Sequence, residues 1–199
     1  MNDQHFIFNV LSSIVARSED NEVQEMVLNL ADFLRFSFGE SRALEPLARE
    51  LDAVVPYFAL QQSLHGKNLV CRIKSSLETR RVPAVPGMLH TLLRNAFHEG
   101  LKTSAMPLRI EVSAALEQMP ATSGAGSILV IKVANTGRLT EAYTANRDPC
   151  LSGLRENLGK IFGGIATMDV SESPPWVKWT IRIPVALADR SFERILNEG

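Results

Sequence analysis

The chain has 199 residues, of which 45% are hydrophobic, and its 21 basic and 22 acidic side chains leave a net charge of −1. This size and composition predict one large or two small globular domains with substantial cores. Because the charges are balanced and no basic run occurs, nucleic-acid binding has no electrostatic basis.

No apolar run is long enough to span a bilayer, and no secretory signal pattern opens the chain. Cys71 and Cys150 are far apart and belong to no C-x-x-C motif. Their placement argues against a zinc site or a disulfide framework. We therefore expect a cytoplasmic protein with no membrane contact of its own, either free or as the cytoplasmic part of a membrane-anchored receptor.

The first third of the chain is predicted to be helical. Apolar residues recur every three or four positions from Phe6 to Ile14 and, after a polar break at 18–21, from Val23 to Phe38. The pattern leaves open whether the break bends one helix or separates two. A stop at Gly39 precedes a second long amphipathic segment at 44–60, so the two segments predict an antiparallel hairpin.

Such a hairpin has more apolar surface than it can cover alone. It must lie against the following domain or pair with a second copy in a four-helix bundle. We expect a homodimer whose interface is formed by an apolar stripe of Phe33, Leu47, Leu51, Val54 and Phe58.

After Gly66 the hydrophobic period changes from helical to alternating. Strands are predicted at 69–73, 108–112, 128–133, 165–170 and 176–183, and helices around Asn95, at 153–162 and at 186–196. The polar segment 138–149 has no apolar period and is expected to be a mobile loop. The composition thus changes from a helical bundle to a mixed sheet with helices, an α+β fold.

Asn95 lies one helical turn before Glu99 in the apolar run 92–100. Both side chains can therefore share one helix face while the apolar residues pack on the other. An amide oxygen is a hard ligand that Mg²⁺ accepts. The pattern predicts a metal–nucleotide site, although an ordinary solvated helix face has the same spacing.

His5 and Asn9 are one turn apart near the start of the first helix. An exposed neutral imidazole is a nucleophile that accepts a phosphoryl group without special activation. A surface histidine without a role is the alternative. That alternative holds for His65, His90 and His98, none of which has a partner at ligand spacing.

Two further patterns point to a ligand. Asn135-Thr136-Gly137 follows the strand at 128–133, where glycine lets the backbone approach a ligand and the amide accepts from an exocyclic amine. Gly153, at the predicted start of a helix, would present free N–H groups to phosphate. An ordinary turn and an ordinary helix start would look the same.

In this order, the motifs resemble those of the LytS-like sensor histidine kinases. The likeness extends over nearly the whole chain, and its first motif is the most specific, since aromatic, aliphatic, aromatic and Asn residues follow the histidine in register. The matching segments are His5-Phe6-Ile7-Phe8-Asn9, Leu93 to Gly100, Val133 to Gly137, Gly153-Leu154 with Phe162-Gly163-Gly164, and Ile181 to Pro184.

The resemblance implies an α+β fold with two domains. Residues 1–66 would form a helical hairpin that carries the phosphoacceptor and dimerises as a four-helix bundle, and residues 67–199 would form a GHKL-type ATP-binding α/β sandwich with a mixed sheet. It also implies ATP and Mg²⁺ as cofactors, transfer of the γ-phosphoryl group to a histidine, and its passage to the receiver domain of a response regulator.

The resemblance also assigns roles to single residues. His5 would be the phosphoacceptor with Asn9 beside it, Asn95 would ligate Mg²⁺, and Asn135 would read the adenine amine. The implied nucleotide-binding residues are Asn95, Glu99, Asn135, Gly137, Gly153 and Leu154.

The chain departs from the family pattern at five places. Asp3-Gln4 stand where the family has Asn-Pro, Arg94 where it has Glu, Glu99 where it has His, and Asn135 where it has Asp. The run from Gly153-Leu154 to Phe162-Gly163 is also too short for the lid helix of the family. Arg94 either repels Mg²⁺ or holds a phosphate oxygen. Two other functions therefore stay open: a degenerate, non-catalytic module that binds a regulator, and a GHKL ATPase unrelated to signalling.

Overall fold

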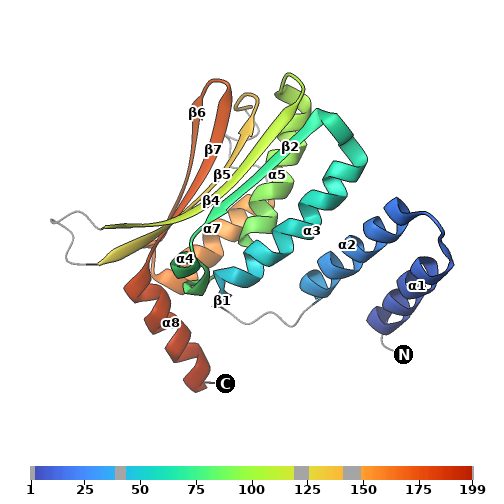
Figure 1. The fold of residues 1–199 in the computed structure, drawn as a ribbon. Helices are drawn as coiled ribbons and strands as arrows, with labels where there is room; N and C mark the ends of the chain where they lie inside the picture. Colours follow the sequence, from blue (N-terminus) through green and yellow to red (C-terminus); the bar gives the residue numbers. More distant parts are fainter. Residues whose placement is uncertain (1–2, 39–43, 119–125, 141–148, 199) are drawn as a thin grey trace.

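The computed structural model describes residues 3–38, 44–118, 126–140 and 149–198. A helical hairpin precedes a five-stranded mixed sheet that is covered by helices on one face (Figure 1). The predicted α+β class is thereby confirmed. None of the described helices is long and apolar enough to cross a membrane.

The helices are α1 (Asp3–Arg17), α2 (Asn21–Phe38), α3 (Leu47–His65), α4 (Leu77–Arg81), α5 (Met88–Thr103), α7 (Pro149–Phe162) and α8 (Val185–Glu198), with a 3-10 turn η1 (Gly66–Asn68). The large sheet contains β2 (Leu69–Ser75), β4 (Leu108–Gln118), β5 (Ser127–Thr136), β6 (Thr167–Ser173) and β7 (Trp176–Pro184). A small second sheet pairs β1 (Glu45–Pro46) with β3 (Pro83–Ala84). The predicted strands are all present, whereas α4 and the small sheet were not predicted.

The large sheet has the strand order β2-β4-β5-β7-β6. Only β2 and β4 are parallel, and every other neighbouring pair is antiparallel. Val133 of β5 lies opposite Val112 of β4 and Trp179 of β7, so these side chains share the face that the helices cover. The strand β5 is therefore central and its inward residues are buried.

The polar break after α1 separates two helices. Asp20 Oδ1 accepts the Glu22 N–H at 2.8 Å, which satisfies one of the unpaired amides at the start of α2. Gln24 Nε2 donates to the Ser18 carbonyl oxygen at 2.7 Å and ties the end of α1 to the start of α2. This answers the question that the hydrophobic pattern left open.

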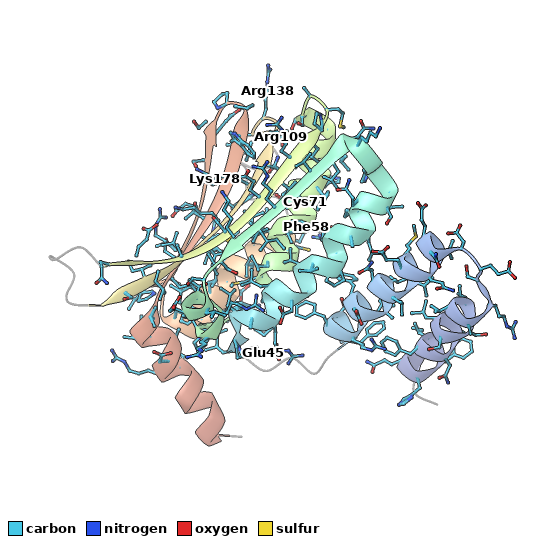
Figure 2. All side chains as sticks on the ribbon, viewed as in Figure 1. Glu45, Phe58, Cys71, Arg109, Arg138 and Lys178 are labelled. Atoms are coloured by element: carbon cyan, nitrogen blue, oxygen red, sulfur yellow. The ribbon has the colours of Figure 1, made fainter. Side chains whose placement is uncertain are left out.

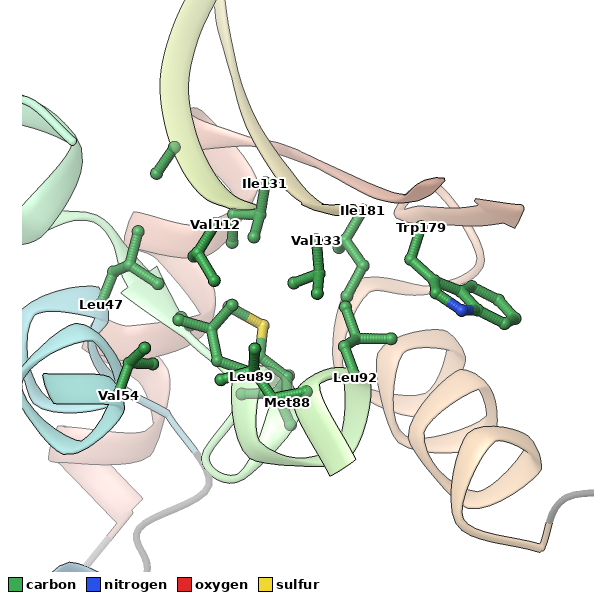
Figure 3. Close-up of a cluster of buried hydrophobic side chains, with 14 of the residues drawn as sticks. Leu47, Val54, Met88, Leu89, Leu92, Val112, Ile131, Val133, Trp179 and Ile181 are labelled. Atoms are coloured by element: carbon green, nitrogen blue, oxygen red, sulfur yellow. The ribbon is translucent and has the colours of Figure 1, made fainter. Parts of the chain in front are cut away.

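Helix α3 packs into the same core as α5 and the sheet. Leu47, Leu51, Val54 and Phe58 are between 0% and 7% exposed, in one cluster with apolar residues of α5 and of the sheet (Figure 3). The prediction that these four side chains form an uncovered dimer stripe is wrong. Because the following segment supplies a covering surface within the chain, no second copy is needed there.

The α1–α2 hairpin contacts the rest of the chain through aromatic rings. The Phe33 ring of α2 lies 5.4 Å from Tyr57 of α3 and 5.2 Å from His90 of α5, measured between centroids. Tyr57 in turn lies 5.5 Å from Phe97. Helix α2 thus packs on α3 and α5. The predicted domain boundary at residue 66 stays a prediction.

Glu50 of α3 fixes the start of α5. It is 2% exposed, and its two carboxylate oxygens accept the N–H groups of Gly87 at 2.6 Å and Leu89 at 2.8 Å. Burial raises the pKa of the Glu50 carboxyl to about 7, although these two backbone hydrogen bonds act in the opposite direction. The orientation of α5 therefore depends on a buried carboxyl contributed by α3.

Candidate functional site

The second half of α5 and the end of β5 lie against each other. Asn95 and Glu99 of α5 are buried, with 7% and 6% exposure. A Cβ at Gly100 would lie 2.6 Å from Leu108 Cδ1 and 3.3 Å from Asn135 Nδ2. Glycine at position 100 therefore lets α5 pack closely on the Leu108 and Asn135 side chains of β4 and β5.

Asn135 ends the buried face of β5 and is fully buried. Its Nδ2 donates to the Thr136 carbonyl oxygen at 2.9 Å, so the amide has a fixed orientation. Within the described residues no group donates to its Oδ1. A buried acceptor without a donor is unfavourable, and a ligand carrying an N–H group would satisfy it.

Gly137 forms the turn after β5. Its φ of +136° lies in the region that favours glycine, and a Cβ there would clash with Thr103 Oγ1. Its N–H donates to the Pro175 carbonyl oxygen in the turn between β6 and β7, at 2.8 Å. The predicted Asn-x-Gly turn is present and leaves no room for a side chain.

Glu99 connects α5 to the segment after β5. Its carboxylate lies 2.9 Å from His98 Nδ1 and accepts hydrogen bonds from Lys102 Nζ and Thr140 Oγ1, both at 3.1 Å. Burial alone would raise the pKa of Glu99, but these hydrogen bonds and the Lys102 charge outweigh burial and hold the pKa below its ordinary value. Glu99 is therefore an ionised carboxylate at neutral pH.

Thr103 makes a second link between the same two elements. Its hydroxyl donates to the Glu99 carbonyl oxygen at 2.8 Å and accepts the Arg138 N–H at 3.1 Å. Neither Thr103 nor Thr140 was predicted from the sequence. Thr103 follows Glu99 by four residues, so helical spacing offered a signal for it, whereas nothing local to residue 140 indicated its contact.

Arg94 lies on another side of α5. Burial is the main reason why the pKa of His90 is lowered, and the positive charge of Arg94 adds to it. Arg94 also lowers the pKa of Tyr57, although burial dominates and raises it. The guanidinium therefore acts on the junction with α3, and its two predicted roles toward Mg²⁺ or phosphate stay predictions.

Comparison with known proteins agrees with this arrangement. Residues 2–69 match the family described as histidine kinase. The sensor protein kinase HptS of Staphylococcus aureus is 26% identical over 117 residues, which cover 58% of this chain and 23% of HptS. The chain is a relative of the sensor histidine kinases. The matched part is less than a quarter of the length of these curated relatives.

Several solved histidine kinases share the fold of this chain. The kinase domain of a blue-light activated histidine kinase from Erythrobacter litoralis matches 94% of this chain and 98% of its own, with a TM-score of 0.52 at 11% identity. AdeS of Acinetobacter baumannii matches 91% and 94%, with a TM-score of 0.52 at 12% identity. The histidine kinase ThkA, in complex with the response regulator TrrA, matches 93% of this chain and 59% of its own, with a TM-score of 0.50 at 12% identity.

Helix α7 of this chain begins earlier than predicted. The helix begins at Pro149, so Gly153 lies in its second turn, where its N–H faces the Pro149 carbonyl. The prediction that Gly153 presents a free N–H at a helix start is wrong. The helix extends four residues further because proline fits its first turn. Leu154 is 6% exposed in the core, and residues 141–148 of the predicted loop lie outside the described residues.

The predicted acceptor lies in the kinase-family segment but away from α5. His5 and Asn9 are exposed on α1. Near them, Gln4 Nε2 donates to the Phe38 carbonyl oxygen of α2 at 3.3 Å. Helices α2 and α3 lie between α1 and α5 (Figure 1), so His5 on α1 is separated from the region where the second half of α5 meets Asn135 and Gly137. Asn95 lies on α5 one turn before Glu99, which binds Thr140 in the segment after β5.

No group of three or more His, Cys, Asp or Glu side chains among the described residues is arranged to hold a metal ion. Mg²⁺ in a nucleotide site does not require one, because it is held by one or two protein oxygens together with phosphate oxygens and water. The buried amide of Asn95 is compatible with that kind of site.

Proposed function

We propose that the chain is the cytoplasmic catalytic core of a LytS-like two-component sensor histidine kinase. It would use ATP and Mg²⁺ to phosphorylate His5 and then pass the phosphoryl group to a response regulator. The observation that carries this proposal is that the second half of α5 meets Asn135, Gly137 and Thr140, with the buried Asn95 one turn before Glu99 on the same helix. The histidine-kinase fold, shared with a kinase solved in complex with a response regulator, supports the class of partner.

The nucleotide would bind between α5 and the end of β5. Asn135 offers its unsatisfied Oδ1 to an exocyclic amine, and the hydrogen bond from the Gly137 N–H to the Pro175 carbonyl oxygen holds the turn beside it in place. Asn95 would hold Mg²⁺ through its amide oxygen, and Glu99 would hold the segment after β5 in place through Thr140. When bound, the Mg²⁺-nucleotide supplies the phosphoryl group to be transferred.

His5 would accept that group through a neutral imidazole nitrogen. Its exposure on α1 makes it accessible, and Asn9 lies one turn further on the same helix. Phosphoryl transfer requires mainly positioning and charge neutralisation. Since α2 and α3 separate α1 from α5, His5 must reach the nucleotide by movement of the hairpin or from a second copy.

The proposed homodimer would form through α1. Phe6, Val10 and Ile14 recur every four residues on α1 and are 60%, 41% and 42% exposed. These residues replace the stripe that α3 buries within the chain. Light scattering at increasing concentration measures the dimer, and Val10→Glu is expected to shift it toward monomer.

The decisive experiment measures acid-labile phosphate on the chain after incubation with γ-labelled ATP and Mg²⁺. We expect label on the wild type, none on His5→Gln, and undiminished label on the control His65→Gln, which removes a histidine at the end of α3. Persisting phosphohistidine in His5→Gln would rule out the acceptor. Transfer of the label to candidate receiver domains then tests the partner class.

A non-catalytic interaction module is the second candidate, and a specific observation favours it. Glu99 stands where the family has His, and its carboxylate is engaged by Lys102 and Thr140. ATP binding without labelled protein, together with binding of a receiver domain, would support this candidate. ATP hydrolysis without phosphoprotein would instead support a GHKL ATPase.

A further inference from the structure

The large sheet has one face that no described helix covers (Figure 1). We call it the outer face; it consists of the side chains that alternate with the buried ones along the strands. It carries six cations and three carboxylates: Arg72, Lys74, Arg109, Lys132, Lys178 and Arg182, with Glu111, Glu117 and Asp169. Because the whole chain has a net charge of −1, this excess of cations shows that positive charge is concentrated on the outer face.

Each carboxylate of the outer face has one cationic partner. The N–O distances are 3.9 Å for Arg72–Glu111, 3.5 Å for Lys132–Glu117 and 3.3 Å for Arg182–Asp169. Within the described residues, three exposed cations of this face pair with no carboxylate: Lys74, Arg109 and Lys178. The uncompensated charge is therefore positive and lies on three different strands.

Short side chains occupy the surface of the sheet between these cations. Ala134, Thr136 and Thr180 face outward from the central strands, yet they are no more than 9% exposed. Beside them, a hollow of about 200 Å³ is lined by Val70, Arg72, Arg109 and Glu111. Figure 2 shows Arg109 and Lys178 near the same end of the sheet. A carboxylate entering the hollow would meet the guanidinium groups of Arg72 and Arg109.

The chain carries a complementary acidic segment. Residues 18–25, here called the acidic turn, contain Glu19, Asp20, Glu22 and Glu25 and no cation. All four are exposed, and none forms an ion pair with another described residue. The turn joins α1 and α2, which lie on the opposite side of α3 and α5 from the outer face (Figure 1). In this arrangement the two surfaces of one chain are apart, whereas the acidic turn of a second copy can reach the outer face.

We propose that the outer face of one chain binds the acidic turn of a second chain. The contact joins two different surfaces, so it can link dimers built on the α1–α2 hairpin into larger assemblies. Because the pairs are exposed, each one is individually weak, and the assembly depends strongly on salt. Lys74, Arg109 and Lys178 supply the net attraction, since the remaining cations already have partners.

An anionic membrane fits this face less well. Three carboxylates are interspersed among the cations and would repel a uniformly negative surface. The sheet is also strongly twisted (Figure 1), so a flat bilayer would contact only part of it. The acidic turn carries several carboxylates on one short stretch. A short segment of this kind can follow the twisted outer face and enter its hollow, whereas a flat surface cannot.

Sedimentation velocity of the intact chain at 50 mM and 500 mM salt tests the proposal. We expect species larger than the dimer at low salt and their loss at high salt. Arg109→Glu combined with Lys178→Glu should weaken this association by about tenfold or more. The matched control, Arg81→Glu with Arg190→Glu, makes the same charge change at exposed positions of α4 and α8, outside the large sheet, and should have little effect.

A charge exchange makes the test specific. Glu22→Lys with Glu25→Lys should also weaken association, and mixing this variant with Arg109→Glu/Lys178→Glu should restore it between the two chains. The proposal is overturned if no salt-sensitive assembly forms, if the control variant loses it equally, or if mixing restores nothing. Binding of anionic vesicles that needs Arg109 and Lys178, without self-association, would overturn it in favour of a membrane.

Discussion

Glu50 should make the stability of the chain fall as pH rises through neutrality. Its carboxyl is 2% exposed, and burial raises its pKa from an ordinary 4.5 to about 7. A carboxyl whose pKa is raised on folding stabilises the fold when neutral. That contribution is fully present below pH 4.5 and is lost as the pH rises through 7. The difference in pKa corresponds to roughly 3 kcal/mol.

Glu50→Gln removes this pH dependence. Glutamine is neutral at every pH and keeps one acceptor oxygen, but its NH₂ group must face the N–H of Gly87 or Leu89. The lost hydrogen bond costs about 1 kcal/mol. The wild type should therefore be the more stable protein at pH 5 by about 1 kcal/mol, and the less stable one at pH 8 by about 2 kcal/mol.

Urea unfolding at pH 5, 6, 7 and 8 measures both proteins, and the difference between their unfolding free energies isolates Glu50. Glu172→Gln, at an exposed position of β6, controls for the loss of one carboxylate. A wild-type-minus-variant difference that stays constant from pH 5 to pH 8 would refute the reasoning. In that case the backbone hydrogen bonds at the start of α5 would compensate the burial of the carboxylate.

Two further substitutions test the turn after β5. Asn135→Asp restores the family residue, yet it should lower the free energy of unfolding by about 1 to 3 kcal/mol. A carboxylate oxygen would then face the Thr136 carbonyl oxygen, to which Nδ2 now donates. An unchanged melting temperature would contradict this prediction. Gly137→Ala should cost about 1 to 3 kcal/mol from backbone strain alone and more from the clash with Thr103 Oγ1. Thr103→Ala relieves the clash but also removes two hydrogen bonds of the Thr103 hydroxyl. Gly137→Ala should therefore cost less in a Thr103→Ala background than in the wild type, and an equal cost in both backgrounds would show that strain alone matters.

The strands and the helix of the candidate site could be predicted because their patterns are local. A run of apolar, largely β-branched residues defines β5 from Ser127 to Thr136, and the helical period defines α5 around Asn95. The glycine of the Asn-x-Gly turn also has a local cause, since its φ is one that other residues rarely adopt. Their chemical roles rest on the family resemblance and stay predictions.

Helix ends were less predictable. The start of α7 lies at Pro149 rather than Gly153, because the first turn is set by backbone geometry and not by the apolar period that begins after it. The break after α1 is fixed by hydrogen bonds of Asp20 and Gln24, two ordinary polar residues. Such side chains occur in many loops, so their capping contacts are identified only when the coordinates are known.

The sequence by itself determined that α3 must bury an apolar face, but only the tertiary structure decided what covers it. A periodic stripe specifies that a partner exists without naming it, and here α5 and the sheet supply it within the chain. The links from Glu99 to Thr140 and from Thr103 to Arg138 join residues more than thirty positions apart. Contacts of that kind leave no local period, because they depend on how strands and helices pack together.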